Sequence, residues 1–315
     1  MKVINQEFGE RWALYHGDCV EVIKGIPDNS IHFSIFSPPF PSVFTYSDSE
    51  RDMGNSIENN DFIDHFGFLN NGLYRVIMPG RLVAVHCMNI LATITKDGHI
   101  GVKDFRGDII RAMCNAGFIY HSEVLIWKDP LLQAVRTKAL GLAHKQIVKD
   151  SAMCNQGLPD FIEVFRKPGA NPEPVAHPNG FTRYVGKDAE PKAEKQSNQR
   201  VNKYSHQVWQ KYASPVWFDI NQSDTLNVQG ARENRDERHI CPLQLQTIER
   251  CLELWTNPGD TVLSPFAGIG SEGYQAIQQG RNFIGIELKE SYWRTAVKNM
   301  KLLDNKPEQL ELAFD

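Results

Sequence analysis

A glycine-rich turn near the end of the chain constrains its fold most. The segment SPFAGIGSEG carries the spacing Gly268-x-Gly270-x-x-Gly273 between a predicted strand and a predicted helix. Glu287 ends the next predicted strand, 19 residues after Gly268. This pattern is typical of dinucleotide-binding turns, in which glycines let the backbone approach the ligand and an acid binds ribose hydroxyls. Only 28 residues follow Glu287 in a chain of 315, so earlier segments must supply the rest of the sheet.

The amino-terminal part provides such strands, in alternation with helices. Short β-favouring runs occupy 31–36, 81–87 and 118–127, and amphipathic helical patterns occupy 61–80 and 104–118. The alternation returns late in the chain, with helices predicted at 237–255, 270–280 and 289–303 and strands at 259–266 and 281–288. Strands that alternate with helices predict an α/β fold whose mostly parallel sheet is covered by helices on both faces.

The segment from about 130 to 237 interrupts this alternation. Residues 133–150 are predicted to form one basic helix, and residues 187–200 are polar with almost no apolar content. Residues 131–211 hold 13 Lys and Arg against 7 Asp and Glu, a local charge of 13 − 7 = +6, whereas the whole chain carries −4. A basic segment on an acidic body indicates either a bound polyanion or an ordinary solvated loop, and composition leaves both open.

Composition also bears on the cellular setting. No apolar run approaches the roughly 18 residues of a membrane span, and the first residues lack the apolar core of a signal peptide. The six cysteines are scattered without a paired C-x-x-C spacing, at Cys19, Cys87, Cys114, Cys154, Cys241 and Cys251. We therefore expect a cytoplasmic protein with neither a disulfide framework nor a metal site.

The position of the glycine turn disfavours a nicotinamide or flavin dehydrogenase. Such a fold needs several further strand–helix units after the turn, and the chain ends too soon for them. S-adenosylmethionine also needs an acid for its ribose but no cradle for a pyrophosphate. Phe266, just before the turn, adds apolar surface that a pyrophosphate site does not require. The turn therefore favours S-adenosylmethionine as the cofactor.

Two motifs together resemble the signature of a known family. Ser37-Pro38-Pro39-Phe40 follows the predicted strand 31–36, and Phe266-Ala267-Gly268-Ile269-Gly270-Ser271 forms the late turn. Their types and order resemble the permuted β group of DNA amino-methyltransferases, and the lesser stretches 16–31 and 238–245 resemble further motifs of that family. The resemblance implies a circularly permuted, Rossmann-like methyltransferase fold. Residues 1–130 and 238–315 would form its catalytic domain, and residues 131–237 an inserted target-recognition region.

The resemblance also implies which residues hold S-adenosylmethionine. Asp18 would face the adenine, the stretch around His239 and Pro242 would lie beside the methionine end, and Glu287 would bind the ribose. Ser264 stands where the family often has Asp. The residues implied in cofactor binding are Asp18, Cys19, His239, Pro242, Ser264, Phe266, Ala267, Gly268, Gly270, Ser271 and Glu287.

The Ser-Pro-Pro-Phe corner is predicted to be catalytic. An exocyclic amino group is a poor nucleophile, because its lone pair is conjugated with the ring, so it needs hydrogen-bond acceptors that position it. Ser37 Oγ and the Pro38 carbonyl would accept from the amine, Pro39 would hold the corner rigid, and Phe40 would stack on a base flipped out of duplex DNA. An inert proline loop is the alternative reading, and the cofactor motifs disfavour it.

The substrate follows from the same resemblance. Ser at the first motif position accompanies mainly N4-cytosine methylation, and Asp or Asn mainly N6-adenine methylation, so cytosine is favoured. Adenine N6, RNA and protein glutamine remain alternatives, and the intact motifs disfavour a decayed module that only binds DNA. Phosphate contacts are expected from Arg136, Lys138, His144, Lys145 and Lys149. An ordinary solvated helix face would carry the same kinds of residues and is the alternative.

The partners expected from this reading are double-stranded DNA in a bacterial or phage setting, with a homodimer and a cognate restriction endonuclease compatible with it. His86 and His121 lie beside predicted strands and read as packed histidines rather than catalysts. The loop 46–55 follows the catalytic corner and is expected to close over cofactor or DNA.

Overall fold

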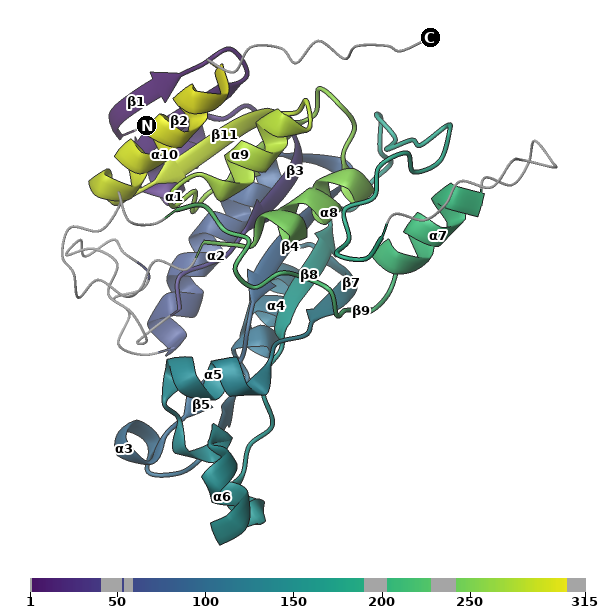
Figure 1. Ribbon diagram of the computed structural model, residues 1–315. Coiled ribbons are helices and arrows are strands. Elements are labelled where there is room, and N and C mark those ends of the chain that lie inside the picture. The colour runs from purple at the N-terminus through teal and green to yellow at the C-terminus, as the bar shows by residue number, and fades with distance from the viewer. Residues whose placement is uncertain (1, 41–52, 54–58, 190–202, 228–241, 305–315) are drawn as a thin grey trace.

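A central sheet organises the computed structural model, which describes residues 2–40, 53, 59–189, 203–227 and 242–304 (Figure 1). Within these residues the sheet has nine strands. From one edge to the other they are β1 (Val3–Phe8), β2 (Trp12–Gly17), β11 (Asn282–Glu287), β10 (Thr261–Ser264), β3 (Ile31–Phe36), β4 (Ile77–Cys87), β8 (Asp160–Arg166), β7 (Ile119–Ile126) and β9 (Val216–Trp217).

Most neighbouring strands run parallel. β2, β11, β10, β3 and β4 form a continuous parallel set, β8 is antiparallel to both β4 and β7, and β1 is antiparallel to β2. The carboxyl ends of β2, β11, β10, β3, β4 and β7 therefore meet at one edge of the sheet, together with the amino end of β8. This arrangement confirms the predicted α/β class with a mostly parallel sheet.

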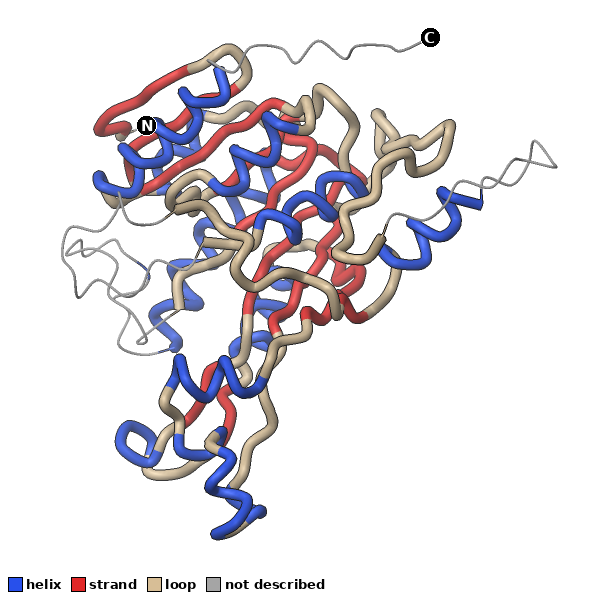
Figure 2. Tube along the Cα trace, viewed as in Figure 1, coloured by secondary structure: helices blue, strands red, loops and turns tan. Residues whose placement is uncertain are grey.

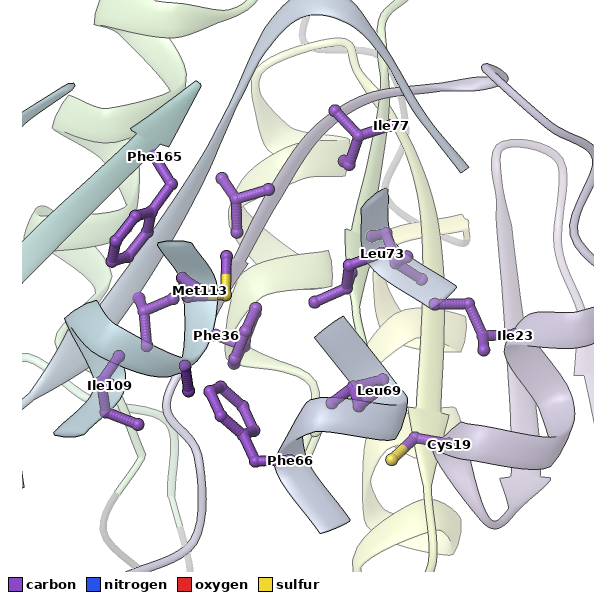
Figure 3. Packing of buried hydrophobic residues seen from close by; sticks show 14 of the residues in the cluster. Cys19, Ile23, Phe36, Phe66, Leu69, Leu73, Ile77, Ile109, Met113 and Phe165 are labelled. Atoms are coloured by element: carbon purple, nitrogen blue, oxygen red, sulfur yellow. The ribbon is translucent and has the colours of Figure 1, made fainter. Parts of the chain in front are cut away.

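Two apolar cores separate the sheet from helices on its two faces. The first core lies under α1 (Cys19–Val22), α2 (Asn59–Val76) and α4 (Phe105–Asn115). Figure 3 shows Phe36 of β3 among Phe66, Leu69 and Leu73 of α2 and Ile109 and Met113 of α4. Because alternate side chains of a strand point to opposite faces, Val83 and Val85 enter this core and Ala84 enters the other.

The second core lies under α8 (Leu245–Trp255), α9 (Ser271–Gln278) and α10 (Glu290–Asp304). Phe33 and Ile35 of β3 face it, as does Val262 of β10. Trp293 of α10 is buried there and donates its indole N–H to the carbonyl oxygen of Leu14 at 3.2 Å. Helices on both faces leave the strand ends as the place for a site (Figure 2).

The predicted inserted region, residues 131–237, is only partly outside the sheet, and this corrects its boundaries. β8 lies inside that range and pairs with β4 on one side and β7 on the other. Its residues Ile162 and Val164 enter the second core, whereas Phe165 enters the first. The sheet needs this strand between two others, so residues 160–166 belong to the same sheet as β3 and β10. β9 also lies in the range and extends the sheet beyond β7.

The predicted basic helix 133–150 is also wrong as a single element. It consists of α5 (Pro130–Thr137) and α6 (His144–Lys149), with a 3₁₀ turn, Leu140–Leu142, between them. Lys138 adopts a left-handed conformation with φ of 53° and ends α5. A non-glycine residue in that region cannot continue a right-handed helix. The helix predicted for 61–80 likewise ends early, at Val76. β4 begins at the next residue, Ile77, and includes Pro79 and Gly80.

An arm extends from the carboxyl edge of the sheet, at the bottom of Figure 1. It contains the hairpin of β5 (Ile90–Ala92) and β6 (Gly101–Lys103), the short helix α3 (Ile94–Asp97), α5 and α6. The hairpin follows β4 and the helices follow β7. A further helix, α7 (Lys203–Tyr212), lies near β9 and buries Val208 and Tyr212 against Phe181 and Val185. None of the described helices has the length and apolar character needed to cross a membrane.

Candidate active site

The two motifs predicted to act together do meet, although they stand near opposite ends of the chain. β3, which leads into Ser37, pairs in parallel with β10, which leads into the glycine turn. Ser34 Oγ donates to the carbonyl of Leu263, 229 positions later, at 2.9 Å. Just beyond the strands the rings of Phe36 and Phe266 lie 5.7 Å apart. The Ser-Pro-Pro-Phe corner and the glycine turn are therefore neighbours at the carboxyl edge.

The glycine turn has one open face and one packed face. Gly268 and Gly270 have φ values of +51° and +89°, which side chains other than glycine rarely adopt. A Cβ atom on Gly268 would meet nothing within 4 Å, whereas one on Gly270 would lie 3.3 Å from the Cβ of Ala296 in α10. Gly270 thus allows the turn to pack on α10, and Gly268 faces space that a ligand can fill.

Glu287 joins the end of β11 to this turn. Its Oε2 accepts from the backbone N–H of Gly268, and its Oε1 accepts from that of Lys289, both at 2.8 Å. The carboxylate of Glu287 thus holds the backbone of the glycine turn to the end of β11. The residue is half-buried at the edge.

Asp18 lies on the next strand end. β2 pairs with β11 so that His16 is opposite Glu287, which places Asp18 just beyond the same edge. Its side chain caps α1 by accepting from Val20 N–H at 2.9 Å. Burial raises the pKa of the Cys19 thiol, and the nearby carboxylates of Asp18 and Glu287 raise it further. Cys19 packs in the first core as a neutral thiol.

Ser264 and Ser271, which were predicted to touch the cofactor, lie at the end of β10 and at the start of α9. Both residues are buried, and within the described part of the chain their hydroxyl oxygens are shielded from solvent and have no hydrogen-bond partner. The contact of either hydroxyl with a cofactor stays a prediction. Ala267 is buried as well, but its backbone N–H already donates to the carbonyl of Ile286 at 2.9 Å.

For the remaining predicted cofactor residues, the structure gives only their burial and their apolar neighbours. Phe266 is half-buried against the first core, where it meets Phe36. Pro242 is half-buried directly before Leu243, a residue of the second core. His239 lies outside the described residues, as does most of the predicted closing loop 46–55.

The Ser-Pro-Pro-Phe corner contacts a histidine that the sequence suggested was only packed. Ser37 Oγ lies 2.8 Å from Nδ1 of His86, near the end of β4. Pro38 is buried and Pro39 half-buried, which holds the corner against the body. Phe40 is half-buried too, with its ring 5.6 Å from that of Phe105. The hydroxyl of Ser37 is therefore fixed by a side chain of the neighbouring strand.

This contact continues across two more strands. Nε2 of His86 lies 3.2 Å from Oδ2 of Asp160 at the start of β8, and Oδ1 of Asp160 lies 2.5 Å from Nζ of Lys128, just after β7. Asp160 is 1% exposed. Burial alone would raise its pKa, but the Lys128 ammonium and the His86 imidazole lower it, so the carboxylate stays ionised. None of the motifs recognised in the sequence contains His86, Asp160 or Lys128.

The predicted DNA contacts lie on the arm. All five side chains are exposed, on α5, on α6 or at the end of α5: Arg136, Lys138, His144, Lys145 and Lys149. The arm leaves the sheet from the edge that carries the Ser37 corner, so a polyanion bound to it would pass near the site.

One cluster among the described residues could hold a metal ion, namely His32, Glu173 and Asp260. It lies at the start of β3, away from Ser37 at the end of that strand. Its donors are already engaged: Arg81 forms an ion pair with Asp260, and His32 Nδ1 accepts from the backbone N–H of Thr261 at 3.0 Å. These contacts explain the cluster as a structural one.

Comparison with known proteins gives the family. A family model described as DNA methylase, covering N6 and N4 methyltransferases, matches residues 31–298. The chain belongs to this family. The N6/N4 methylase match runs from β3 through α10, so it includes both motifs and the whole segment between them.

Individual relatives agree with this assignment. The DNA adenine methyltransferase YhdJ of Escherichia coli is 42% identical over 64 residues, which are 20% of this chain and 22% of YhdJ. The matched segments span only 16% to 37% of the length of five such curated relatives.

Two solved structures share the fold over almost the whole chain. TTHA0409 of Thermus thermophilus, a candidate DNA modification methylase in complex with S-adenosyl-L-methionine, has a TM-score of 0.63 at 19% identity, covering 94% of this chain and 97% of its own. The cytosine-N4-specific PvuII DNA methyltransferase has a TM-score of 0.63 at 15% identity, covering 98% of this chain and 92% of its own. The circular permutation itself stays a prediction.

Proposed function

We propose that this N6/N4 methylase transfers a methyl group from S-adenosylmethionine to the exocyclic amino group of a base in duplex DNA, with cytosine N4 as the favoured target. The observation that carries the proposal is the meeting of the Ser37 corner with the glycine turn at the ends of β3 and β10. One motif would hold the amine and the other the cofactor, so donor and acceptor would face each other across neighbouring strands.

The residues at the turn fit S-adenosylmethionine. The space above Gly268 is open, Glu287 places a carboxylate beside that space, Asp18 stands on the next strand end, and Phe266 supplies an apolar surface. When bound there, the cofactor supplies an electrophilic methyl group on a sulfonium. The acidic side chains near the turn also suit the positive charge of a sulfonium.

The chain's own task is to make the amine reactive. Ser37 Oγ and the Pro38 carbonyl would accept hydrogen bonds from the amino hydrogens, which localises the lone pair on nitrogen. His86 fixes the Ser37 hydroxyl at 2.8 Å, so this acceptor does not have to be ordered during the reaction. Phe40 would offer a ring beside the flipped base.

The choice of base rests on two similarities that point in different directions. The Ser37 corner and the fold of the cytosine-N4-specific PvuII enzyme favour cytosine, whereas YhdJ, a relative at higher identity over a short segment, acts on adenine. Adenine N6 is therefore the second candidate. A homodimer and a cognate endonuclease stay predictions.

Labelled S-adenosylmethionine tests the proposal. The protein is incubated separately with unmethylated duplex DNA, RNA and protein, and the DNA is digested to nucleosides and separated. Label in N4-methylcytosine is the expected result, and label in N6-methyladenine selects the second candidate. Label only in RNA or protein, or none at all from an active preparation that binds the cofactor, would contradict the proposal.

A further inference from the structure

We propose that His86 removes the proton that the target amine must lose, acting through the hydroxyl of Ser37, and that Asp160 and Lys128 position His86 for this task. The inference rests on the proposed amino-methylation and deepens it. The four side chains come from the ends of β3, β4, β7 and the start of β8, so they form one line along the carboxyl edge of the sheet.

The reaction needs a proton acceptor. A primary amine that gains a methyl group has one proton too many for the neutral product, and this proton has to leave. A serine hydroxyl and a peptide carbonyl are both far too weak as bases to keep it. The imidazole of His86 contacts the Ser37 hydroxyl, and a neutral imidazole is the side chain that most often acts as a general base.

The contacts of His86 define which nitrogen accepts the proton. Nε2 lies 3.2 Å from Oδ2 of Asp160 as an ion pair without hydrogen-bond geometry, and the negative charge of that carboxylate favours the tautomer with its proton on Nε2. Nδ1 then has a lone pair and accepts from the Ser37 hydroxyl at 2.8 Å. In that arrangement the lone pairs of Ser37 Oγ point away from His86 and are free to accept from the amine.

The step balances without an added reactant. The amine nitrogen forms a bond to the methyl carbon while the carbon–sulfur bond breaks and its electron pair stays on sulfur. One N–H proton passes to Ser37 Oγ as the hydroxyl proton passes to Nδ1 of His86. The result is a neutral methylated amine, a thioether and an imidazolium, which afterwards releases its proton to solvent. Nothing is oxidised or reduced.

The charges around His86 fit a reversible base. Among the described residues the charged groups facing it are Asp160 from β8 and Lys128 after β7, and β3 contributes the uncharged Ser37. The carboxylate lies nearer the new positive charge than the ammonium does and stabilises it. The ammonium balances the carboxylate in the neutral state. His86 is 12% exposed, which leaves a route for the proton to leave.

A purely structural network would show the same contacts, so the test needs a readout that packing does not change. His86→Asn keeps a polar atom near the position of Nδ1, which can hold Ser37, but it cannot take up a proton. The measurement is the single-turnover rate of DNA methylation from about pH 5 to about pH 9, a range that spans the titration of histidine. Cofactor affinity by calorimetry and thermal melting show whether each variant is folded.

For the wild type we expect the rate to fall tenfold per pH unit on the acid side, as His86 becomes protonated. His86→Asn should lower the rate by about 10²- to 10⁴-fold and lose this acid limb, while cofactor affinity stays within about twofold. The matched control is His121→Asn, because His121 is exposed on β7 and faces the Ser122 hydroxyl instead of the site. Its profile should equal that of the wild type.

Several outcomes would overturn the proposal. A His86→Asn enzyme that keeps the wild-type rate or keeps the acid limb excludes His86 as the base. If His86→Asn does not fold, a wild-type profile without an acid limb excludes it as well. These results differ from failure of the proposed function, in which the wild type itself methylates no DNA.

Discussion

The two halves of the site are built in different ways. In the cofactor half, at the ends of β2, β11 and β10, the contacts run mostly through the backbone: Glu287 accepts from two main-chain N–H groups and Asp18 caps a helix. In the substrate half, at the ends of β3, β4, β8 and β7, they run from side chain to side chain, from Ser37 through His86 to Asp160.

This difference has a chemical reason. A turn that holds a small ligand needs an unusual backbone, and glycine is the residue that adopts it, so the motif is contiguous and visible in the sequence. A proton path needs one functional group from each of several strands. These residues are therefore isolated positions in the sequence and form no contiguous motif. The charges differ as well, since the carboxylates of Asp18 and Glu287 lie beside the turn whereas the arm is basic.

Removal of the Ser37 hydroxyl should have the largest effect and should be confined to the substrate half. Ser37→Ala removes an acceptor for the amine and the link to His86, so we expect turnover to fall at least as far as in His86→Asn, to the upper end of about 10²- to 10⁴-fold. Cofactor affinity, set by the other half, should not change. Methylation kinetics and calorimetry on the same preparation measure the two quantities. Wild-type turnover in this variant would remove Ser37 from the mechanism, and Ser37→Thr, which keeps a hydroxyl, serves as the control.

Removal of the Glu287 carboxylate should lower cofactor affinity and leave turnover unchanged, which is the opposite of the effect expected for Ser37→Ala. Glu287→Ala loses the acceptor for ribose hydroxyls and releases the Gly268 N–H, so we expect cofactor affinity to fall by about 10- to 100-fold, the range of a charge-assisted hydrogen bond. Turnover at saturating cofactor should stay near that of the wild type. Glu287→Gln keeps one acceptor oxygen and should lie between the two. Wild-type affinity in Glu287→Ala would contradict the ribose assignment.

The sequence predicted the α/β class of the sheet and that the late glycine turn takes its neighbouring strands from the amino-terminal part. The glycine turn, Glu287 and the Ser37 corner are contiguous motifs, and their meeting followed from the small number of strands left after the turn. The cofactor contacts of Ser264 and Ser271 stay predictions, and both residues are buried. Solvent exposure of a hydroxyl depends on how the turn packs on its helix, and the motif does not encode that packing.

The sequence did not predict the substrate half beyond Ser37. The strand 160–166, DFIEVFR, stands within a basic, proline-rich stretch, and its pairing partners lie more than thirty residues earlier. Only its register, with His86 opposite Ile162, brings Asp160 to His86. One signal was available for the arm: Asp129 followed by Pro130 is a helix start, and it marks α5 as a separate element.

The cofactor half contains a buried acid whose ionisation should make stability depend on pH. Burial, with a further contribution from Glu287, raises the pKa of Glu272 from 4.5 to about 8. The folded protein therefore binds a proton that the unfolded chain releases, so stability falls as pH rises from about 4.5 to about 8. Glu272→Gln should remove this loss and increase the free energy of unfolding at pH 8, relative to pH 5, by about 1 kcal/mol for each pH unit between them.

Urea unfolding of both proteins at the two pH values measures this effect. Glu290→Gln is the control, because Glu290 is an exposed acid on α10 whose pKa is lowered by Arg294 instead of raised. An equal pH dependence in the wild type and Glu272→Gln would show that Glu272 is ionised in the folded protein.

The smallest effect is expected on the arm, where the substrate half extends beyond the sheet. Lys145 and Lys149 are exposed on α6, and a lysine on a phosphate contributes counterion release but no chemistry. Lys145→Ala and Lys149→Ala should each weaken DNA binding several-fold and lower the salt slope of log Kd by about 1, with turnover at saturating DNA unchanged. Fluorescence anisotropy at several salt concentrations measures the slope, and Lys298→Ala, on α10 at the far side of the sheet, is the charge-matched control (Figure 1). Equal slopes for all three variants and the wild type would show that α6 is a solvated surface that does not contact DNA. The substrate half would then consist of the strand ends alone.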